Sequence, residues 1–460
     1  MTGFPKHFLV LAAALLASAT ALPTGAAEQW VVPTPEAQQR SVDLVRETYK
    51  EQYAAATDGA RQSELAGELI KKAEETKDDP PLCFALLKEA AGLAAKAGNL
   101  WMAMKVVDDL ERRFRGQGNR KAMLAERGGT RRTERAVSGA LTWLANHQLA
   151  DGNWSFRNYT QRCRDATCTG PGSANADAGA TAMGLLPFLA AGHTHKTDGP
   201  YRGNIAAGIN WLIHHQGPDG NLAKGSSPPM YSHGMATMAL CEAYGLSGDK
   251  NVGTAAQGAV NFIVKAQNQQ TGGWRYNPGD PGDTSVLGWQ VMALKSAKMA
   301  GLSVGESAFT GAGKWLDGCM NGRNGHRYRY LPGGPTSHSM TSVGLLSRQY
   351  LGVKRDSPMM ADGVKYLMNH LPDAEPPNVY YWYYASQVLH NMSGYEWDQW
   401  NRRMRKILVD SQCKESSSCA NGSWDPAGDT WGKVGGRLMV TSLAALTLEV
   451  YYRYPPLYRD

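Results

Sequence analysis

The sequence has little that would suit a membrane-spanning or nucleic-acid-binding protein. After an apolar run near the N-terminus, its 460 residues contain no second hydrophobic segment long enough to cross a bilayer. The net charge of +7 is modest for this length. Much of it lies in residues 112–135, which lack a pattern of aromatic residues interleaved with basic ones. We therefore expect no transmembrane segment and no nucleic-acid partner.

The first 27 residues have the features of a secretory signal peptide. Lys6 precedes an apolar run from Phe8 to about Leu16, and small residues follow at 19–21 and 25–27. A short apolar run with small residues at the cleavage positions is typical of such signals. We therefore expect a mature protein that is secreted or periplasmic.

Residues 28–114 are predicted to form a separate helical domain. Apolar residues recur there at helical spacing, with charged residues on the opposite faces, and Asp79-Pro80-Pro81 and Gly98-Asn99 supply turns. The pattern resembles a short helical-hairpin array of the tetratricopeptide type, which implies a surface for a protein partner. A basic linker is expected at 115–134.

Six copies of one helical hairpin are predicted between residues 135 and 460. In each copy a bulky side chain late in the first helix precedes a loop, often rich in glycine, and then a second helix rich in small residues. The bulky side chains are Trp143, Trp211, Phe262, Trp315, Tyr366 and Ile407. A period of about fifty residues with two helices per unit indicates a closed or stacked helical array. Small residues allow six inner helices to approach one axis.

Several of the loops inside these hairpins carry a Gly-x-Trp sequence. Examples are residues 148–154 (QLADGNW), 269–274 (QQTGGW) and 421–424 (NGSW). A Gln at the end of one helix can reach backbone groups at the start of the next, while the Trp packs across the loop. We expect these elements to staple neighbouring hairpins together.

The Gln-to-Trp loops, the small-residue inner helices and the period resemble the α/α toroid of the terpenoid cyclase and protein prenyltransferase superfamily. The resemblance covers about 135–460, is closest at 272–297, and suggests a squalene-cyclase-like, prenyltransferase-repeat protein of a secreted bacterial type. It implies an all-α fold: an (α/α)6 toroid with six inner helices around a cavity, here preceded by the small helical domain.

The active-site motifs of that superfamily are incomplete in this chain. Triterpene cyclases carry Asp-x-Asp-Asp-Thr, whose central Asp protonates the substrate, but residues 280–284 place Gly282 at that position. Prenyltransferases hold zinc with an Asp, a nearby Cys and a distant His. Asp283 and His338 match the first and last, while Ser285 stands where the Cys would help. A terpene cyclase or transferase is therefore the less favoured reading. No cofactor is expected, with zinc as the alternative.

Four of the seven cysteines form two close pairs in the loops of the first and last hairpins. Cys163 and Cys168 are five residues apart, and Cys413 and Cys419 are six apart. Two local disulfides suit an oxidising compartment. A metal site built from all four is the alternative, because the first and last repeats would meet when the ring closes.

One position recurs at the N-terminal end of each inner helix, four residues before a Thr or Ser (Leu287 in the third helix). On a toroid these side chains would share one rim of the cavity. They are Asp177, His233, Asp283, His338, Trp382 and Arg437. The two Asp residues also suit helix N-caps. Two His residues in one register, each preceded by Ser, favour a shared function.

Two classes of function remain for this rim. We favour a non-catalytic ligand-binding or scaffold protein, because the superfamily acid is absent. The alternative is an enzyme on an extracytoplasmic glycan or lipid, with acid–base chemistry by Asp283 and His338 or His233, and with Asp177 as a further candidate. Aromatic residues at 378–387, together with Trp289 and Tyr330, suit a sugar or lipid. The ligand-binding candidates are Trp382, Tyr381, Arg437 and Trp289.

Overall fold

The computed structural model of the protein describes residues 30–31, 33, 35–76, 78–115, 127–373, 375–453 and 457. The expected signal peptide and much of the expected linker lie outside these residues. The chain divides into two compact units, one of residues 1–93 with 106–116 and the other of 94–105 with 117–460.

The N-terminal part is a set of amphipathic helices, as the sequence predicts. They are α2 (Pro35–Thr48), α3 (Lys50–Ala55), α4 (Gly59–Glu75), α5 (Pro80–Lys96) and α6 (Leu100–Arg113), with a short parallel pair of strands, β1 (Trp30–Val31) and β2 (Phe114–Arg115). Asp58 caps α4 by accepting the N–H of Arg61, and Leu65 and Leu69 lie in the core.

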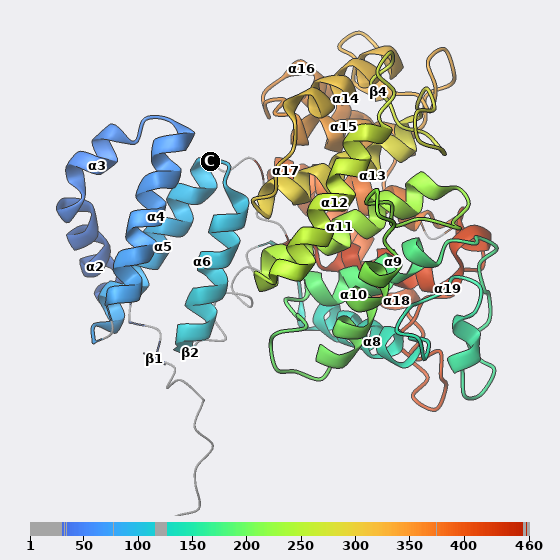
Figure 1. Cartoon of the computed structure of the whole chain (residues 1–460), viewed down its shortest axis with the longest axis horizontal. Coiled ribbons are helices and arrows are strands. Elements are labelled where there is room, and N and C mark those ends of the chain that lie inside the picture. Colours follow the sequence, from blue (N-terminus) through green and yellow to red (C-terminus); the bar gives the residue numbers. More distant parts are fainter. Residues whose placement is uncertain are drawn as a thin grey trace, which may run out of the picture. The chain divides into compact units, whose positions relative to one another are not determined.

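The remaining helices form an (α/α)6 toroid. The outer helices are α8 (Arg131–Asn146), α10 (Arg202–His214), α12 (Lys250–Ala266), α14 (Glu306–Cys319), α16 (Pro358–Met368) and α18 (Gly394–Ser411). The inner helices are α9 (Asp177–Ala190), α11 (Pro229–Ser247), α13 (Thr284–Met299), α15 (His338–Tyr350), α17 (Val379–Met392) and α19 (Gly432–Leu448). Each inner helix packs on the next, and α19 packs on α9 (Figure 1). The ring is therefore closed, which confirms the predicted fold.

Short elements complete the toroid. A 3-10 turn, η1 (Tyr159–Arg162), lies in the first loop, and β3 (Met320–Asn321) pairs antiparallel with β4 (Arg327–Tyr328) in the fourth. Helix α20 (Val450–Arg453) follows α19. Helix α8 begins at Arg131, inside the expected linker, because Thr130 and Thr133 form a reciprocal capping box.

Glycines let the inner helices approach one another closely. A Cβ added at Gly288 on α13 would lie 2.4 Å from the Val343 side chain on α15. One added at Gly234 on α11 would lie 2.6 Å from the Gln290 amide on α13. Both distances are too short for a real contact. The small residues are therefore required by the diameter of the inner ring, as the sequence predicts.

Glutamines staple each of four hairpins to the outer helix of the next one. The Nε2 group of each donates to the carbonyl of a loop glycine and to a carbonyl in the first two turns of the next outer helix. These are Gln148, Gln216, Gln267 and Gln412. The Gln412 amide bonds Gly422 O at 2.8 Å and Ala136 O at 2.7 Å. The last staple thus ends on the first outer helix and closes the ring.

The tryptophans of the Gly-x-Trp loops tie the two helices of a hairpin together. Trp154 Nε1 donates to Leu144 O on the outer helix at 2.8 Å, and Trp154 N donates to Thr181 Oγ1 on the inner helix at 3.1 Å. Trp424 repeats both bonds, to Leu408 O and Thr441 Oγ1. The structural role predicted for these loops is confirmed.

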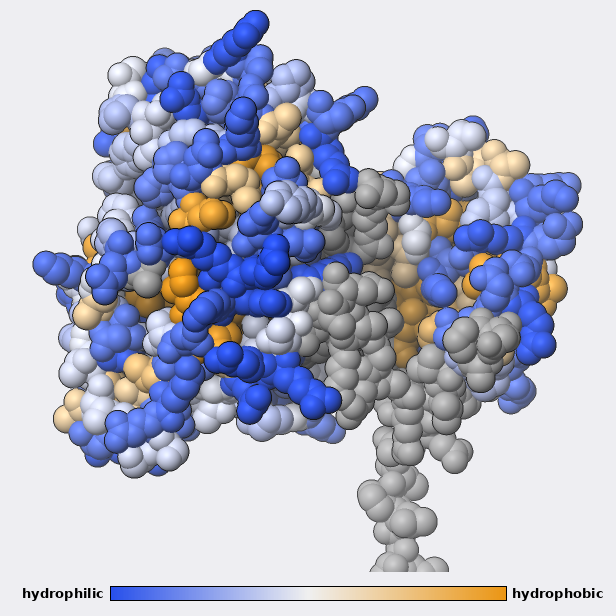
Figure 2. Space-filling view, turned by 180° about the vertical axis from the view of Figure 1, so that it is seen from behind, coloured by the Kyte–Doolittle hydropathy of each residue, from blue (hydrophilic) through white to orange (hydrophobic). Residues whose placement is uncertain are grey.

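The surface agrees with the composition. Figure 2 shows one face of the protein, on which hydrophilic residues predominate and hydrophobic ones form small separate patches. Among the described helices, none combines the length and apolarity needed to cross a bilayer.

The glutamine staples can be tested at Gln267, whose Nε2 bonds Gly272 O and Ala308 O. We expect Gln267→Ala to lower the free energy of unfolding by about 1–3 kcal/mol, because two hydrogen bonds are lost and their carbonyls stay buried. Denaturant titration measures the change. Gln270→Ala, at an exposed neighbouring position, should change it by less than about 0.5 kcal/mol. Equal effects of the two variants would refute the staple.

Candidate functional site

All the inner helices begin at the same end of the ring, where the connecting loops join neighbouring repeats. Met230 N, at the start of α11, donates to Tyr276 O at 3.1 Å, and Thr284 N, at the start of α13, donates to Tyr330 O at 3.0 Å. The rim positions predicted from the sequence therefore belong to one end of the toroid. Their individual surroundings differ, and only Asp283 lies in a cluster with the chemistry of a ligand site.

Asp283 is a buried helix cap with one carboxyl oxygen left over. Its Oδ1 atom accepts the N–H of Val286 at 2.8 Å, and its own N–H donates to Trp274 O at 2.8 Å. The side chain is fully buried, and Oδ2 has no partner with hydrogen-bond geometry. Burial raises the pKa of Asp283 to about 6, against the opposing effects of the Val286 N–H and the Tyr330 hydroxyl. The N-cap interpretation of the sequence is confirmed, and Oδ2 is a buried carboxyl oxygen outside the capping bond.

Tyrosines surround this carboxyl group. The Tyr330 hydroxyl lowers the pKa of Asp283. It also forms a hydrogen bond with the Tyr276 hydroxyl, at 2.7 Å. Ser285 Oγ and the Tyr380 hydroxyl are 2.8 Å apart. Rings continue the cluster, since Tyr231 and Tyr276 have centroids 6.2 Å apart and Tyr380 and Tyr384 have centroids 5.0 Å apart. We call this set the carboxyl–tyrosine cluster: Tyr231, Tyr276, Asp283, Ser285, Tyr330, Tyr380 and Tyr384.

Among the buried polar atoms of the inner helices that lack partners, two belong to neighbouring rings, Tyr384 and Trp289. The Tyr384 hydroxyl and Trp289 Nε1 make no hydrogen bond, although Tyr384 is fully buried and Trp289 nearly so. Trp289 contacts the Tyr384 ring, with centroids 5.8 Å apart, and stacks on Tyr383 at 6.0 Å. Unpaired buried polar groups are rare in proteins. Asp283 Oδ2, the Tyr384 hydroxyl and Trp289 Nε1 are thus three buried polar atoms without a partner of hydrogen-bond geometry.

His233 does not lie on an open rim, which corrects the prediction for this residue. It is fully buried; Nδ1 accepts the N–H of Leu222 at 3.1 Å, and the Nε2 group donates to Ala259 O at 3.0 Å. Burial lowers its pKa to about 4. The second repeat has Leu222 where other loops have Trp. Here His233 accepts the loop N–H that a Thr accepts in other repeats, and it bonds Ala259 O on α12, the outer helix of the next hairpin.

His338 is displaced from the predicted register by one residue. Thr341, and not Ser342, accepts the loop N–H of Tyr328, at 3.1 Å. The equivalent of Asp283 is therefore the N-cap Ser337. One residue turns a helical side chain by about 100°, so His338 contacts Tyr381, at a ring distance of 4.5 Å, and His370, at 5.6 Å. Burial and His370 lower its pKa. Among the described residues, the structure records no bond from His338 or His233 to Asp283.

The other predicted residues lie in different surroundings. Tyr381 and Trp382 are buried in the core, and the Tyr381 hydroxyl donates to His370 O at 2.8 Å. Asp177 is half-buried in the first turn of α9. The sequence did not single out Tyr231, Tyr276 or Tyr384 as a cluster, because their proximity depends on the packing of α11, α13 and α17.

Arg437, a predicted ligand-binding residue, forms a clamp between the last and first repeats. Its buried guanidinium donates from Nε to Thr169 O at 2.9 Å, from Nη1 to Ser423 Oγ at 3.1 Å and from Nη2 to Asp425 Oδ2 at 2.9 Å. Thr169 belongs to the first repeat, and Ser423 and Asp425 belong to the last.

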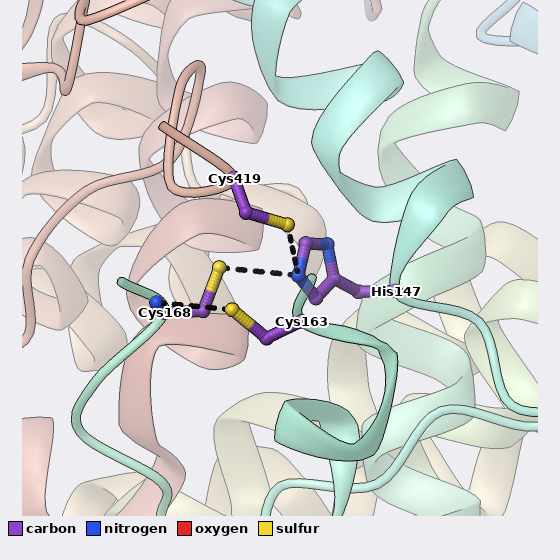
Figure 3. Close-up of side chains that lie close together, drawn as sticks. All are labelled: His147, Cys163, Cys168 and Cys419. Atoms are coloured by element: carbon purple, nitrogen blue, oxygen red, sulfur yellow. Dashed lines mark hydrogen bonds between the residues drawn. The ribbon is translucent and has the colours of Figure 1, made fainter. Parts of the chain in front are cut away.

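The cysteines are arranged differently from two local disulfides. All seven are free thiols in the structure. Cys168 Sγ and Cys419 Sγ lie 3.2 Å and 3.7 Å from His147 Nε2, and Cys163 joins them (Figure 3). The ligand atoms of these four residues, which we call the seam cluster, lie within 4.8 Å of one another. Burial lowers the pKa of His147 to about 4, so its imidazole is neutral at pH 7. These residue types can hold a metal ion.

Comparisons with known proteins identify no family. No family model and no curated protein sequence match the chain. An α-1,6-mannanase, GH76A of Salegentibacter sp. HEL1_6, is similar in structure, with 9% identity, a TM-score of 0.49, and coverage of 69% of this chain and 98% of that chain. A novel α-amylase from Clostridium perfringens has 11% identity, a TM-score of 0.49 and the same coverage. Likeness at this level carries no argument about the site. Membership of the terpenoid cyclase or prenyltransferase superfamily stays a prediction.

The clamp at Arg437 can be tested by removing its charge. We expect Arg437→Met to lower the free energy of unfolding by about 3 kcal/mol, because the buried Ser423 hydroxyl loses its charged donor and the bonds to Thr169 and Asp425 that join the two repeats are lost. Denaturant titration measures it. Arg132→Met is the control, because Arg132 also joins the first and last repeats, through Asp410, but is exposed. It should cost less than about 1 kcal/mol. A cost for Arg437→Met as small as that of the control would contradict the clamp.

The burial of Asp283 predicts a pH-dependent contribution to stability. Between pH 4 and pH 6 the folded protein retains a proton that the unfolded chain releases, so this contribution falls as the pH rises. Over the whole titration, the contribution of Asp283 to the free energy of unfolding falls by about 3 kcal/mol. Asp283→Asn keeps an N-cap but cannot titrate. We therefore expect the variant to gain stability relative to the wild type by up to this amount between pH 4 and pH 7, measured by urea unfolding. Parallel pH profiles would show that Asp283 does not titrate in this way.

Proposed function

We propose that this protein is an extracytoplasmic toroid that binds a polyhydroxylated ligand, a glycan, at the carboxyl–tyrosine cluster without cleaving it. The observation that carries the proposal is the fully buried carboxyl group of Asp283, whose Oδ2 atom lacks a partner with hydrogen-bond geometry, although the Tyr330 hydroxyl is near enough to affect its pKa. The extracytoplasmic location is part of the proposal and is supported by the sequence of residues 1–27.

The chemistry of the cluster favours a sugar over a lipid. Sugar hydroxyls donate to carboxylates and exchange hydrogen bonds with tyrosine hydroxyls, and aromatic rings offer apolar faces beside them. A lipid chain would instead leave Asp283 Oδ2 and the Tyr384 hydroxyl buried without partners, which costs free energy.

Binding without cleavage follows from the number of carboxyl groups. Glycoside hydrolysis typically uses two carboxyl groups on either side of the scissile bond. The cluster contains Asp283 alone, and the structure records no bond from either candidate histidine to it. A single acid can orient a ligand through its hydroxyl groups but lacks a second carboxyl group to act as base or nucleophile.

One observation favours hydrolysis as a second candidate. Burial raises the pKa of Asp283 to about 6, and glycosidases raise the pKa of their general acid in the same way. In this second reading Asp283 would protonate the leaving oxygen, and the missing second carboxyl group would come from outside the cluster.

A glycan array followed by calorimetry on the leading glycan would test binding. We expect Asp283→Asn and Tyr380→Phe each to weaken binding at least about tenfold, or about 1.4 kcal/mol, because each removes a hydrogen-bonding group from the cluster. Asp280→Asn is the matched control. Asp280 is in the preceding loop, where its carboxylate accepts from Asn277, and its replacement should leave binding unchanged.

Three outcomes would be decisive. If no glycan binds, or if Asp283→Asn binds as tightly as the wild type, the proposed site is wrong. If new reducing ends appear on incubation with the wild type and not with Asp283→Asn, the second candidate is correct.

A further inference from the structure

We propose that His147, Cys163, Cys168 and Cys419 bind one Zn²⁺ ion, and that this ion joins the first and last repeats of the ring. The site is separate from the carboxyl–tyrosine cluster and does not depend on the proposed function. Figure 3 shows the four side chains pointing toward one another.

The distances suit a tetrahedral zinc site. Zinc bound at about 2.3 Å from sulfur and about 2.0 Å from nitrogen separates ligand atoms by about 3.5–3.8 Å. His147 Nε2 lies 3.2 Å from Cys168 Sγ and 3.7 Å from Cys419 Sγ, and all four ligand atoms fit within 4.8 Å. Three cysteines and one histidine are a common ligand set of structural zinc sites.

The imidazole of His147 is oriented for metal binding. Its Nδ1 group donates to Trp143 O at 2.7 Å, which leaves the Nε2 lone pair directed at the sulfur atoms. The Trp143 ring stacks on the imidazole at 4.1 Å, and the histidine is fully buried. In a metal-bound histidine, the ring nitrogen that does not bind the metal typically donates a hydrogen bond to another group.

The two cysteines of the first repeat form a compact turn of the C-x4-C type found in zinc sites. Cys168 N donates to Cys163 Sγ at 3.3 Å, which stabilises a thiolate there. Within the turn, Ala166 has a φ of 62°, and the Asp165 carboxylate accepts from Thr167 N at 3.0 Å. Trp143 Nε1 donates to Cys168 Sγ at 3.5 Å. Both sulfurs thus receive N–H donors.

The turn is fastened to the last repeat beside Cys419. Asp165 Oδ2 accepts the N–H of Cys419 at 2.6 Å, and Thr167 Oγ1 lies 2.7 Å from Ser418 Oγ. These bonds hold the fourth ligand in place, although it is about 250 residues from the others in the chain. The metal would therefore connect segments that the covalent chain leaves far apart.

Disulfides explain this arrangement less well. A disulfide between any two of the three sulfurs would leave the third thiol and His147 Nε2 together in the interior. The partner expected for Cys419 in a local pair, Cys413, has Arg437 Nη1 at 3.6 Å. In metal binding, three thiols lose their protons and the neutral imidazole keeps its Nδ1 proton. The centre then carries one net negative charge, and Arg437 stands beside it.

The first test uses the full-length protein purified without chelator. We expect one zinc per chain by elemental analysis, and X-ray absorption should show three sulfur neighbours at about 2.3 Å and one nitrogen at about 2.0 Å. All seven cysteines should alkylate after unfolding with chelator. A metal-free protein after dialysis against zinc, or a zinc ion with only nitrogen and oxygen neighbours, would overturn the proposal. So would protection of four cysteines as two disulfides.

A matched pair of variants separates the metal site from the local disulfides. Cys419→Ser should reduce zinc affinity at least about tenfold, whereas Cys413→Ser should keep one zinc per chain. A disulfide between the two residues predicts equal effects, and equal loss of zinc would contradict the assignment. If Cys419→Ser does not fold, the zinc content of Cys413→Ser and the X-ray absorption spectrum of the wild type still distinguish the zinc site from the local disulfides.

Discussion

The structure depends on one constraint, the closure of the ring between its first and last hairpins. Five of the junctions between repeats join hairpins that follow one another in the chain, but the sixth joins residues near 150 to residues near 420. Gln412, Arg437 and the bond from Asp165 to Cys419 all act at that junction. Closing a loop of this length costs conformational entropy, which the contacts at the junction must offset. The polar contacts at this junction can help to offset that entropy cost.

Closure also creates the carboxyl–tyrosine cluster. Its members come from α11, α13 and α17 and from the loops before α13 and α15, and they meet only because the inner helices begin at one end of a ring. Asp283 combines two roles there. One oxygen caps α13, and the other is left without a partner. The N-cap bond that stabilises α13 therefore also places the second carboxyl oxygen of Asp283 inside the protein, within the cluster.

The sequence predicted the architecture well because its signals are local and repeated. The period, the small residues of the inner helices and the Gln and Trp of the loops each describe one hairpin, and the staples at Gln267 and Gln412 show that this local reading was correct. The site was predicted less well because it depends on contacts between hairpins. Counting four residues back from Ser342 selected His338, whereas the bond from Tyr328 N to Thr341 shows that Ser337 holds that position. His233 looked functional, but its two nitrogens bond a loop N–H and the outer helix of the next hairpin, which only the fold reveals. The cysteines were paired by proximity in sequence, which could not show that the ring also brings Cys419 to Cys163 and Cys168 of the first repeat.

The staples have a further consequence for how such a protein can change size. In an open solenoid, a repeat can be added or lost at an end with little effect on the others. Here the loop glycine of each stapled repeat meets the next outer helix at backbone distance: a Cβ at Gly422 would lie 2.3 Å from Gly139 O, across the final junction. A seventh hairpin would change the angle at every such contact. The number of hairpins is therefore fixed by stereochemistry, and variation in length is confined to the loops.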